Sequence, residues 1–219
     1  MTMLDYDAFR ATPMVLDPFP HLVVREFVPP AQLRAVLLDL PPLDRRGSFP
    51  VSAVRLGRAA RALMAELEGD ALRTAIAEKF GLDLSNSPTM LTLRAWTTER
   101  DGHIHRDSTA KRVTVLLYLN QASGTWGQHE GCLRLLRGPG DLEDYALEVP
   151  PVDGTLLGFL NGPAAWHGHK VFTGQRYSVQ LNYMTTDARA QSELRRHRLS
   201  ALLKRMSRAA SRPSISSQR

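Results

Sequence analysis

The sequence is poor in cysteine, with Cys132 alone among 219 residues. A single cysteine excludes a disulfide framework within one chain, which is typical of proteins from a reducing compartment. The N-terminus, MTMLDYDAFRATP, carries an early acid and lacks the apolar run of a secretory signal, and no later stretch reaches the length of a membrane span. We therefore expect a cytoplasmic protein.

Acidic residues are scarce in the C-terminal segment 188–219, where nine Lys and Arg accompany one acid, Glu193, so that the segment carries +8. The rest of the chain holds 19 bases and 21 acids, a charge of −2, although the whole chain carries +6. The basic charge therefore belongs to the tail, which can meet phosphate, anionic lipid or water. We expect no nucleic-acid partner for the body.

The apolar content of 43% is enough for a buried core, and 219 residues suit one catalytic domain with a tail. Apolar spacing predicts three helices, at 31–40, 58–69 and 70–81, and Asp70 is suited to be the N-cap of the last, which Gly81 ends. A short strand is expected within 17–28 and a loop at 43–57. Alternating strands are predicted at 89–96, 111–120, 132–136, 145–149, 155–160 and 176–184. Many short strands separated by turns are typical of an all-β sandwich or barrel.

The strand predicted at 111–120 shows the alternation most clearly, because side chains of a strand point to opposite faces in turn. One face would carry only apolar residues, Val113, Val115, Leu117 and Leu119. The other face would carry Thr114, Leu116, Tyr118 and Asn120.

Two stretches carry the residues suited to chemistry, HIHRD at 103–107 and WHGHK at 166–170. His105 and Asp107 are two residues apart, so on extended chain they point to the same side and can bind one metal. Alone, such a pair is more often a surface ion pair or part of a turn. His167 and His169 compete as the third ligand. Two imidazoles and one carboxylate form the facial triad that holds iron(II) and leaves three coordination positions open.

Arg176 follows His167 by nine residues, after a turn that contains Gly174. A hairpin would place Arg176 on the strand beside His167. The planar guanidinium grips a carboxylate through two hydrogen bonds, and Ser178, two residues further on the same face, can add a third.

From about residue 91 to 183 the sequence resembles the prolyl-4-hydroxylase-like 2-oxoglutarate and iron(II) dioxygenases. The features that carry the resemblance, in order, are H-x-D, the strand VTVLLYLN, a glycine followed by CLRLL, the strand DGTLLGF, and WHGHKVFTGQRYS. The resemblance implies a mainly β fold, a double-stranded β-helix or jelly roll with helices packed outside. It implies one oxygenase domain at 1–187, with a helical part at 1–84 and a jelly-roll core at 85–187, followed by a basic helix and disordered tail at 188–219.

By position, the resemblance implies that His105, Asp107 and His167 are the iron ligands and the catalytic centre. The contacts that it implies for 2-oxoglutarate are Arg176, Ser178, Tyr118 and Leu133. Family members often carry a tyrosine aimed at the cosubstrate on the strand before H-x-D, and here Trp96 or Arg94 takes that place. A glycine doublet of the family is reduced to one glycine, Gly131, before CLRLL.

The implied cofactors are Fe(II), 2-oxoglutarate as cosubstrate and O2, with ascorbate as a further candidate. The implied reaction hydroxylates an unactivated C–H bond and releases succinate and CO2. Asp107 favours hydroxylation over halogenation, because related halogenases lack that carboxylate. The substrate stays open between a peptidyl residue such as proline, a free amino acid, and a sugar or lipid intermediate. The loops expected to choose it are 43–57, 97–102 and 121–130.

Three other functions compete with this interpretation. His103 and His105 form the H-x-H of cupin-type metal proteins, but Thr109 and Ala110 stand where a cupin needs a glutamate. A zinc hydrolase that uses His103, His105 and His167 would lack an obvious general base. A non-catalytic, ligand-binding relative of the oxygenases is disfavoured by the intact triad.

The basic tail predicts an amphipathic helix at 192–210, with an apolar stripe at helical spacing formed by Leu199, Leu202, Leu203, Met206 and Ala210. The first interpretation is a terminal helix that packs on the body. The second is docking to an anionic membrane surface or a partner. Residues 211–219 are expected to be disordered, and the oligomeric state stays open.

Overall fold

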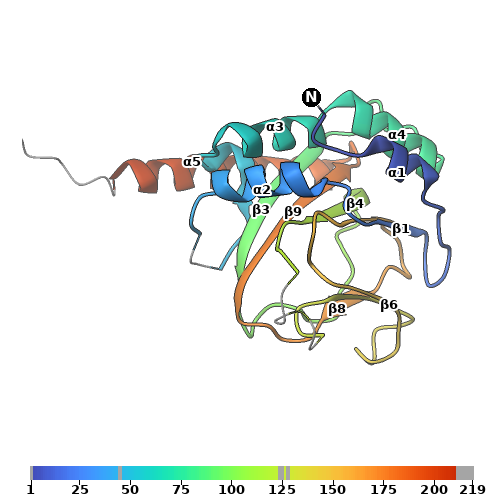
Figure 1. The fold of residues 1–219 in the computed structure, drawn as a ribbon. Helices are drawn as coiled ribbons and strands as arrows, with labels where there is room; N and C mark the ends of the chain where they lie inside the picture. The colour runs from blue at the N-terminus through green and yellow to red at the C-terminus, as the bar shows by residue number, and fades with distance from the viewer. Residues whose placement is uncertain (1, 44–45, 123–125, 127–128, 211–219) are drawn as a thin grey trace, which may run out of the picture.

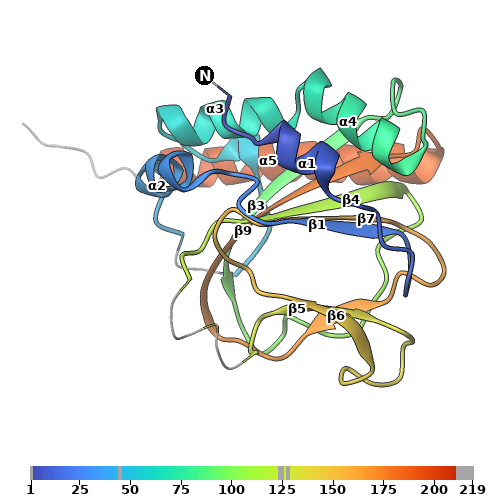
Figure 2. The same ribbon diagram turned by 45° about the vertical axis from the view of Figure 1, so that its right-hand side comes forward.

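Two antiparallel β-sheets face each other, and helices cover the outer face of the larger sheet (Figures 1 and 2). The computed structural model describes residues 2–43, 46–122, 126 and 129–210, with side chains as far as residue 204. The larger sheet has the strand order β1-β7-β4-β9-β3-β2, and the smaller sheet has the order β6-β5-β8. The strands are β1 (His21–Val24), β2 (Phe49–Pro50), β3 (Thr89–Thr97), β4 (Lys111–Tyr118), β5 (Leu133–Leu136), β6 (Tyr145–Val149), β7 (Leu156–Leu160), β8 (His167–His169) and β9 (Gly174–Met184).

The helices agree with the predicted spacing in most places. They are α1 (Tyr6–Ala11), α2 (Pro30–Asp39), the 3₁₀ turn η1 (Val51–Ala53), α3 (Arg58–Leu67), α4 (Asp70–Phe80) and α5 (Ala188–Ala210). The six-residue α1 was not predicted, because it is too short to show a periodic pattern. Gly69, rather than Asp70, is the N-cap of α4, and Asp70 lies in the first turn, where its charge favours the positive helix end. Gly81 ends α4 in the left-handed conformation, with φ at 64°.

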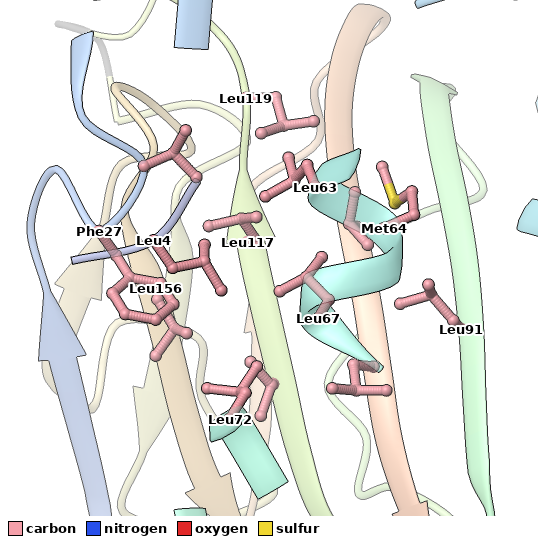
Figure 3. Packing of buried hydrophobic residues seen from close by; sticks show 14 of the residues in the cluster. Leu4, Phe27, Leu63, Met64, Leu67, Leu72, Leu91, Leu117, Leu119 and Leu156 are labelled. Atoms are coloured by element: carbon pink, nitrogen blue, oxygen red, sulfur yellow. The ribbon is translucent and has the colours of Figure 1, made fainter. Parts of the chain in front are cut away.

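The main core lies between the helices and the larger sheet, and β4 confirms the predicted alternation. Its apolar face joins this core with side chains of α3 and α4, as Figure 3 shows for Leu117 and Leu119 beside Leu63 and Leu67. The other face points into the space between the sheets. Successive residues of β4 thus point alternately to the core under the helices and to the space between the two sheets.

The predicted hairpin between His167 and Arg176 is wrong. β8 pairs with β5 in the smaller sheet, whereas β9 pairs with β3 and β4 in the larger sheet. Residues 170–173 therefore cross from one sheet to the other. A turn signal shows that the chain reverses, but it does not say which strands become hydrogen-bonded.

The predicted loop at 43–57 contains two short elements among its described residues. In β2, Phe49 pairs with Leu93 and Pro50 pairs with Thr92, and η1 follows directly. A two-residue strand is too short for an alternating pattern to reveal. This strand completes the edge of the larger sheet next to α5.

The C-terminal helix α5 lies against β2 and η1 rather than apart from the body. Its inward face carries small residues, and Ala190 and Ala201 are buried. The predicted leucine stripe faces outward instead, since Leu199, Leu202 and Leu203 are 55–66% exposed. The side chains of Met206 and Ala210, and the expected disorder at 211–219, lie outside the described part of the chain. No helix among the described residues is long and apolar enough to cross a bilayer.

Candidate active site

A cavity of about 530 Å³ lies between the two sheets and is lined by side chains of both. The larger sheet supplies its floor through three cross-strand rows on β4, β9 and β3. The rows are Tyr118–Ser178–Arg94, Leu116–Gln180–Thr92 and Thr114–Asn182–Met90. The smaller sheet adds Leu133, His167 and His169.

His105 and His167 meet across a short antiparallel bridge. Each backbone N–H donates to the carbonyl of the other residue, with N···O distances of 2.9 and 3.0 Å. The two imidazole centroids are consequently 4.3 Å apart. Asp107, two residues beyond His105, completes a cluster in which one candidate ligand atom of each residue lies within 4.8 Å of the others. Three residues that are far apart in sequence thus converge at one point.

Both imidazoles are oriented by backbone carbonyls. Nδ1 of His105 lies 2.8 Å from the carbonyl oxygen of His103, and Nδ1 of His167 lies 3.0 Å from that of Ala165. Each Nδ1 therefore donates a proton, which leaves each Nε2 lone pair free for a metal. Burial, with the neighbouring His105, lowers the pKa of His167 to about 4. His167 is accordingly neutral at neutral pH, as a ligand must be.

The side chain of Asp107 is only 9% exposed, and it is held at both oxygens. Lys111 donates to Oδ1 at 2.6 Å, and the Thr114 hydroxyl donates to Oδ2 at 2.6 Å. Burial acts to raise the pKa of Asp107, but the charges of Lys111 and His167 and the hydrogen bonds from Lys111 and Thr114 together outweigh it, so this pKa lies below its ordinary value. Asp107 is therefore anionic, and a fixed carboxylate beside two neutral imidazoles fits a divalent metal.

Arg176 lies at the other end of the same cavity, 7% exposed, on β9. Its Nε donates to the carbonyl of Gly131 at 2.9 Å, and its guanidinium carbon lies 5.4 Å from the Tyr118 ring centroid. No carboxylate among the described residues pairs with Arg176. Burial lowers the pKa of Arg176, but a guanidinium stays charged in a protein because its ordinary pKa is so high. Burial raises the pKa of Tyr118 to about 12, so the phenol is neutral. A buried unpaired cation of this kind is suited to an anionic ligand.

Gly131 is one of two glycines on which this geometry depends. It has φ at +70°, and a Cβ there would lie 3.0 Å from the Phe172 side chain. The second is Gly102, whose φ is +95° and where a Cβ would lie 2.4 Å from the carbonyl oxygen of His169. Gly102 lets the chain before H-x-D approach β8 closely enough to accept a hydrogen bond from the His169 N–H at 2.9 Å.

The remaining candidates from the sequence divide into two groups. Ser178, Tyr118 and Leu133 line the cavity, whereas Trp96 does not. Met90, Thr92 and Arg94 face the cavity by regular alternation. The register between β3 and β9 then shifts between Arg94 and Trp96, so Thr97 rather than Trp96 lines the cavity. Of the two residues that the sequence left open, Arg94 lines the cavity and Trp96, which was named as a cosubstrate contact, does not.

Two residues that the sequence left open, Arg94 and His169, line the cavity without belonging to the triad, and Lys111 was not predicted at all. Arg94 donates to Asp101 at 3.0 Å, and Arg46 binds the same carboxylate at 2.9 Å. His169 is 8% exposed, and burial lowers its pKa to about 4. Lys111 also lines the cavity. The sequence did not indicate a site role for Lys111, because the chain between Asp107 and Lys111, four positions apart, is irregular and their contact depends on how that loop folds.

The three loops expected to choose the substrate contribute unequally. Ser48 and Pro50 of the first loop line the cavity, as do Thr97, Asp101 and Gly102 of the second. No described residue of 121–130 lines it, and part of that segment lies outside the described residues. Four residues of α5 also take part, which the sequence did not indicate: Glu193, Arg196, His197 and Ser200.

Residues 92–184 match the model of the 2OG-Fe(II) oxygenase superfamily. The resemblance to the prolyl-4-hydroxylase-like oxygenases is confirmed. This stretch contains His105, Asp107, His167 and Arg176, and it is similar to a superfamily whose description names 2OG and Fe(II). No curated protein matches the sequence at a significant level.

Solved structures of prolyl hydroxylases are similar in fold to this chain. The Pseudomonas putida prolyl-4-hydroxylase aligns with a TM-score of 0.53 at 18% identity, over 82% of this chain and 90% of its own. A Phytophthora capsici prolyl 4-hydroxylase aligns with a TM-score of 0.58 at 17% identity, over 92% and 77%. A Trichoplax adhaerens prolyl hydroxylase, solved with a hypoxia inducible factor peptide, aligns with a TM-score of 0.55 at 18% identity, over 93% and 90%. At such identities the likeness concerns the fold, and it does not carry a substrate from one protein to another.

Within the described residues, the triad is the one cluster of three or more candidate ligands close enough to hold a metal, and His103 is not part of it. The zinc site built on His103 is therefore not supported. The H-x-H of the cupin interpretation fails for the same reason, since His105 turns to Asp107 and His167 instead.

Proposed function

We propose that this protein is a dioxygenase that uses Fe(II) and 2-oxoglutarate to hydroxylate an unactivated C–H bond, with release of succinate and CO2. The observation that carries the proposal is the convergence of His105, Asp107 and His167 at one end of a cavity that holds the unpaired Arg176 at the other. The two facing sheets would be the double-stranded β-helix of the family. Residues 1–187 would form one domain, with α5 added to its cavity.

The three ligand side chains would bind iron on one face and leave the opposite face open. Nε2 of His105 and His167 is available because Nδ1 of each ring is already engaged. Lys111 and Thr114 hold the Asp107 carboxylate in place, so its orientation does not depend on the metal. When bound together, iron and 2-oxoglutarate supply the oxidant made from O2.

Arg176 would hold the distal carboxylate of 2-oxoglutarate through paired hydrogen bonds. Ser178 lies on the same strand face, and the neutral Tyr118 phenol has no hydrogen-bond partner among the described residues. An unpartnered buried hydroxyl is expected to find a partner in a ligand. Leu133 limits the space around the cosubstrate and excludes water.

The test is binding and turnover by the purified full chain. We expect about one Fe(II) or Mn(II) per chain, and slow conversion of 2-oxoglutarate to succinate in the presence of O2 and ascorbate. His167→Ala should abolish both, and the matched control His103→Ala should retain both. Equal metal binding and turnover by the two variants would contradict the assigned triad.

A further inference from the structure

The cavity has two ends, and 2-oxoglutarate accounts for only one of them. The Tyr118–Ser178–Arg94 row and Arg176 form the cosubstrate end. The opposite end is bordered by α5, which contributes Arg196, His197 and Ser200 to the lining. The cluster of His105, Asp107 and His167 borders the same cavity, so a substrate bound beside α5 shares one chamber with the metal site.

The helix α5 is fastened to the body beside this chamber. The hydroxyl of Ser108, directly after Asp107, donates to Glu193. Further along the helix, Lys204 donates to the carbonyl of Ser48 and lies over the Phe49 ring. Ala201 is buried between these two attachments. The residues of α5 that line the cavity are therefore held in place and form a wall.

The charges that line the cavity leave two guanidinium groups without an acidic partner. Lys111 pairs with Asp107, and Arg94 pairs with Asp101. Glu193 is engaged by Ser108 and by Arg189 on its own helix. No ion pair joins Arg176 or Arg196 to any other described residue. 2-Oxoglutarate brings one distal carboxylate, which the buried Arg176 would take. Arg196 borders the cavity from its solvent-exposed side, so its cation is accessible to another ligand.

The surroundings of Arg196 are polar, not apolar. Nε2 of the adjacent His197 is buried from solvent and has no hydrogen-bond partner within the described part of the chain. The floor facing α5 carries the amides of Gln180 and Asn182, and the Asn182 residue is 1% exposed. Buried polar groups of this kind cost free energy unless a ligand or water satisfies them. Oδ1 of Asn182 already accepts hydrogen bonds from Thr114 and Gln180. A purely apolar substrate would therefore leave Nε2 of His197 unpaired and would leave the remaining hydrogen-bonding capacity of the two amides unused.

We propose that α5 forms the substrate subsite of this enzyme, and that the substrate is a small polar molecule whose oxyanion binds Arg196. Hydrogen-bonding groups of the same molecule would meet His197, Gln180 and Asn182. This inference rests on the proposed function, because the metal and 2-oxoglutarate define the other end of the cavity. It favours a free carboxylic acid or phosphate ester over a neutral residue inside a peptide chain.

The test is calorimetric binding to the full chain loaded with Mn(II) and 2-oxoglutarate under anaerobic conditions. The probes are free amino acids paired with their primary amides, sugar phosphates paired with the unphosphorylated sugars, and one prolyl peptide with blocked ends. In at least one pair, the oxyanion member should bind about tenfold or more tightly than its neutral counterpart. The pair whose two members differ in affinity shows whether the bound anion is a carboxylate or a phosphate.

Arg196→Ala should remove that difference, and Arg196→Lys should keep part of it. The matched control is Arg195→Ala, since Arg195 is an exposed neighbour on α5 that does not line the cavity. The control should bind as the parent protein does. The proposal is overturned if no pair separates, if Arg196→Ala keeps the difference, or if the blocked peptide binds most tightly. Failure of Mn(II) or 2-oxoglutarate to bind in the first place would overturn the proposed function as well.

Discussion

The two faces of the larger sheet are built from alternate residues of the same strands, yet they differ in almost every property. On the helix side, Val113, Val115 and Leu117 of β4 are fully enclosed in the main core. On the cavity side, Thr114, Leu116 and Tyr118 line an open chamber. Neighbouring positions on one strand therefore have different roles. One set stabilises the fold, and the other shapes the site.

The largest expected effect comes from the cavity side. Asp107→Ala should reduce conversion of 2-oxoglutarate to succinate to background, at least about a hundredfold, because the cluster loses its anionic ligand. The assay is succinate formation with Fe(II) in excess. The control Lys111→Met removes the same ion pair but keeps the carboxylate, and it should still bind metal. Succinate formation by Asp107→Ala at the parent rate would contradict the role of Asp107 as a metal ligand.

The next effect belongs to the helix side. Leu117→Ala should lower the free energy of unfolding by about 2–5 kcal/mol, because it leaves a cavity in a packed core. Urea denaturation measures it. The adjacent Leu116→Ala should cost clearly less, since Leu116 already borders open space. Equal losses for the two leucines would mean that the two faces do not differ in packing.

Arg176→Ala is expected to raise the 2-oxoglutarate concentration for half-saturation by roughly ten- to a hundredfold, because the distal carboxylate loses a charged partner. The ligand-free protein should not become less stable, since an unpaired buried guanidinium is itself costly. Thermal unfolding with and without 2-oxoglutarate separates these effects, because a ligand stabilises only a protein that binds it. Arg176→Lys should restore part of the binding. An unchanged half-saturation concentration would refute the role of Arg176.

The smallest effect distinguishes two residues of β3. Arg94→Ala should weaken 2-oxoglutarate binding by a few-fold, roughly three- to tenfold, because its guanidinium is already shared with Asp101. Trp96→Ala should leave that binding unchanged, since Trp96 does not line the cavity. Titration of both variants with 2-oxoglutarate measures the two affinities. A larger loss of affinity in Trp96→Ala than in Arg94→Ala would show that Trp96, not Arg94, contacts the cosubstrate.

Local sequence patterns predicted the parts of the fold that repeat over several residues. The strand at 111–118, the helices α3 and α4, and the inward faces of His105 and Asp107 all follow from simple periodicity. The meeting of His105 with His167 was expected only through the resemblance to a family. Strand spacing alone does not say which distant segments pair.

The failures share a physical cause, which is that they depend on contacts between distant segments. The register shift between Arg94 and Trp96 changes which side chain faces inward, and no residue type announces it. The sheet that β8 joins is decided by β5, more than thirty residues away in sequence. On α5, Ala190 and Ala201 face the body instead of the predicted stripe of Leu199, Leu202 and Leu203, because small side chains allow the helix to approach the body closely.

The hydrogen bond between Ser108 and Glu193 has a practical meaning for anyone who trims this protein. A fragment that stops at residue 187 would keep every proposed iron ligand and the whole family match. It would nevertheless lack one side of the chamber, and it would release the loop that follows Asp107. Such a fragment should still decarboxylate 2-oxoglutarate, but it should bind the substrate to be hydroxylated more weakly and with less selectivity.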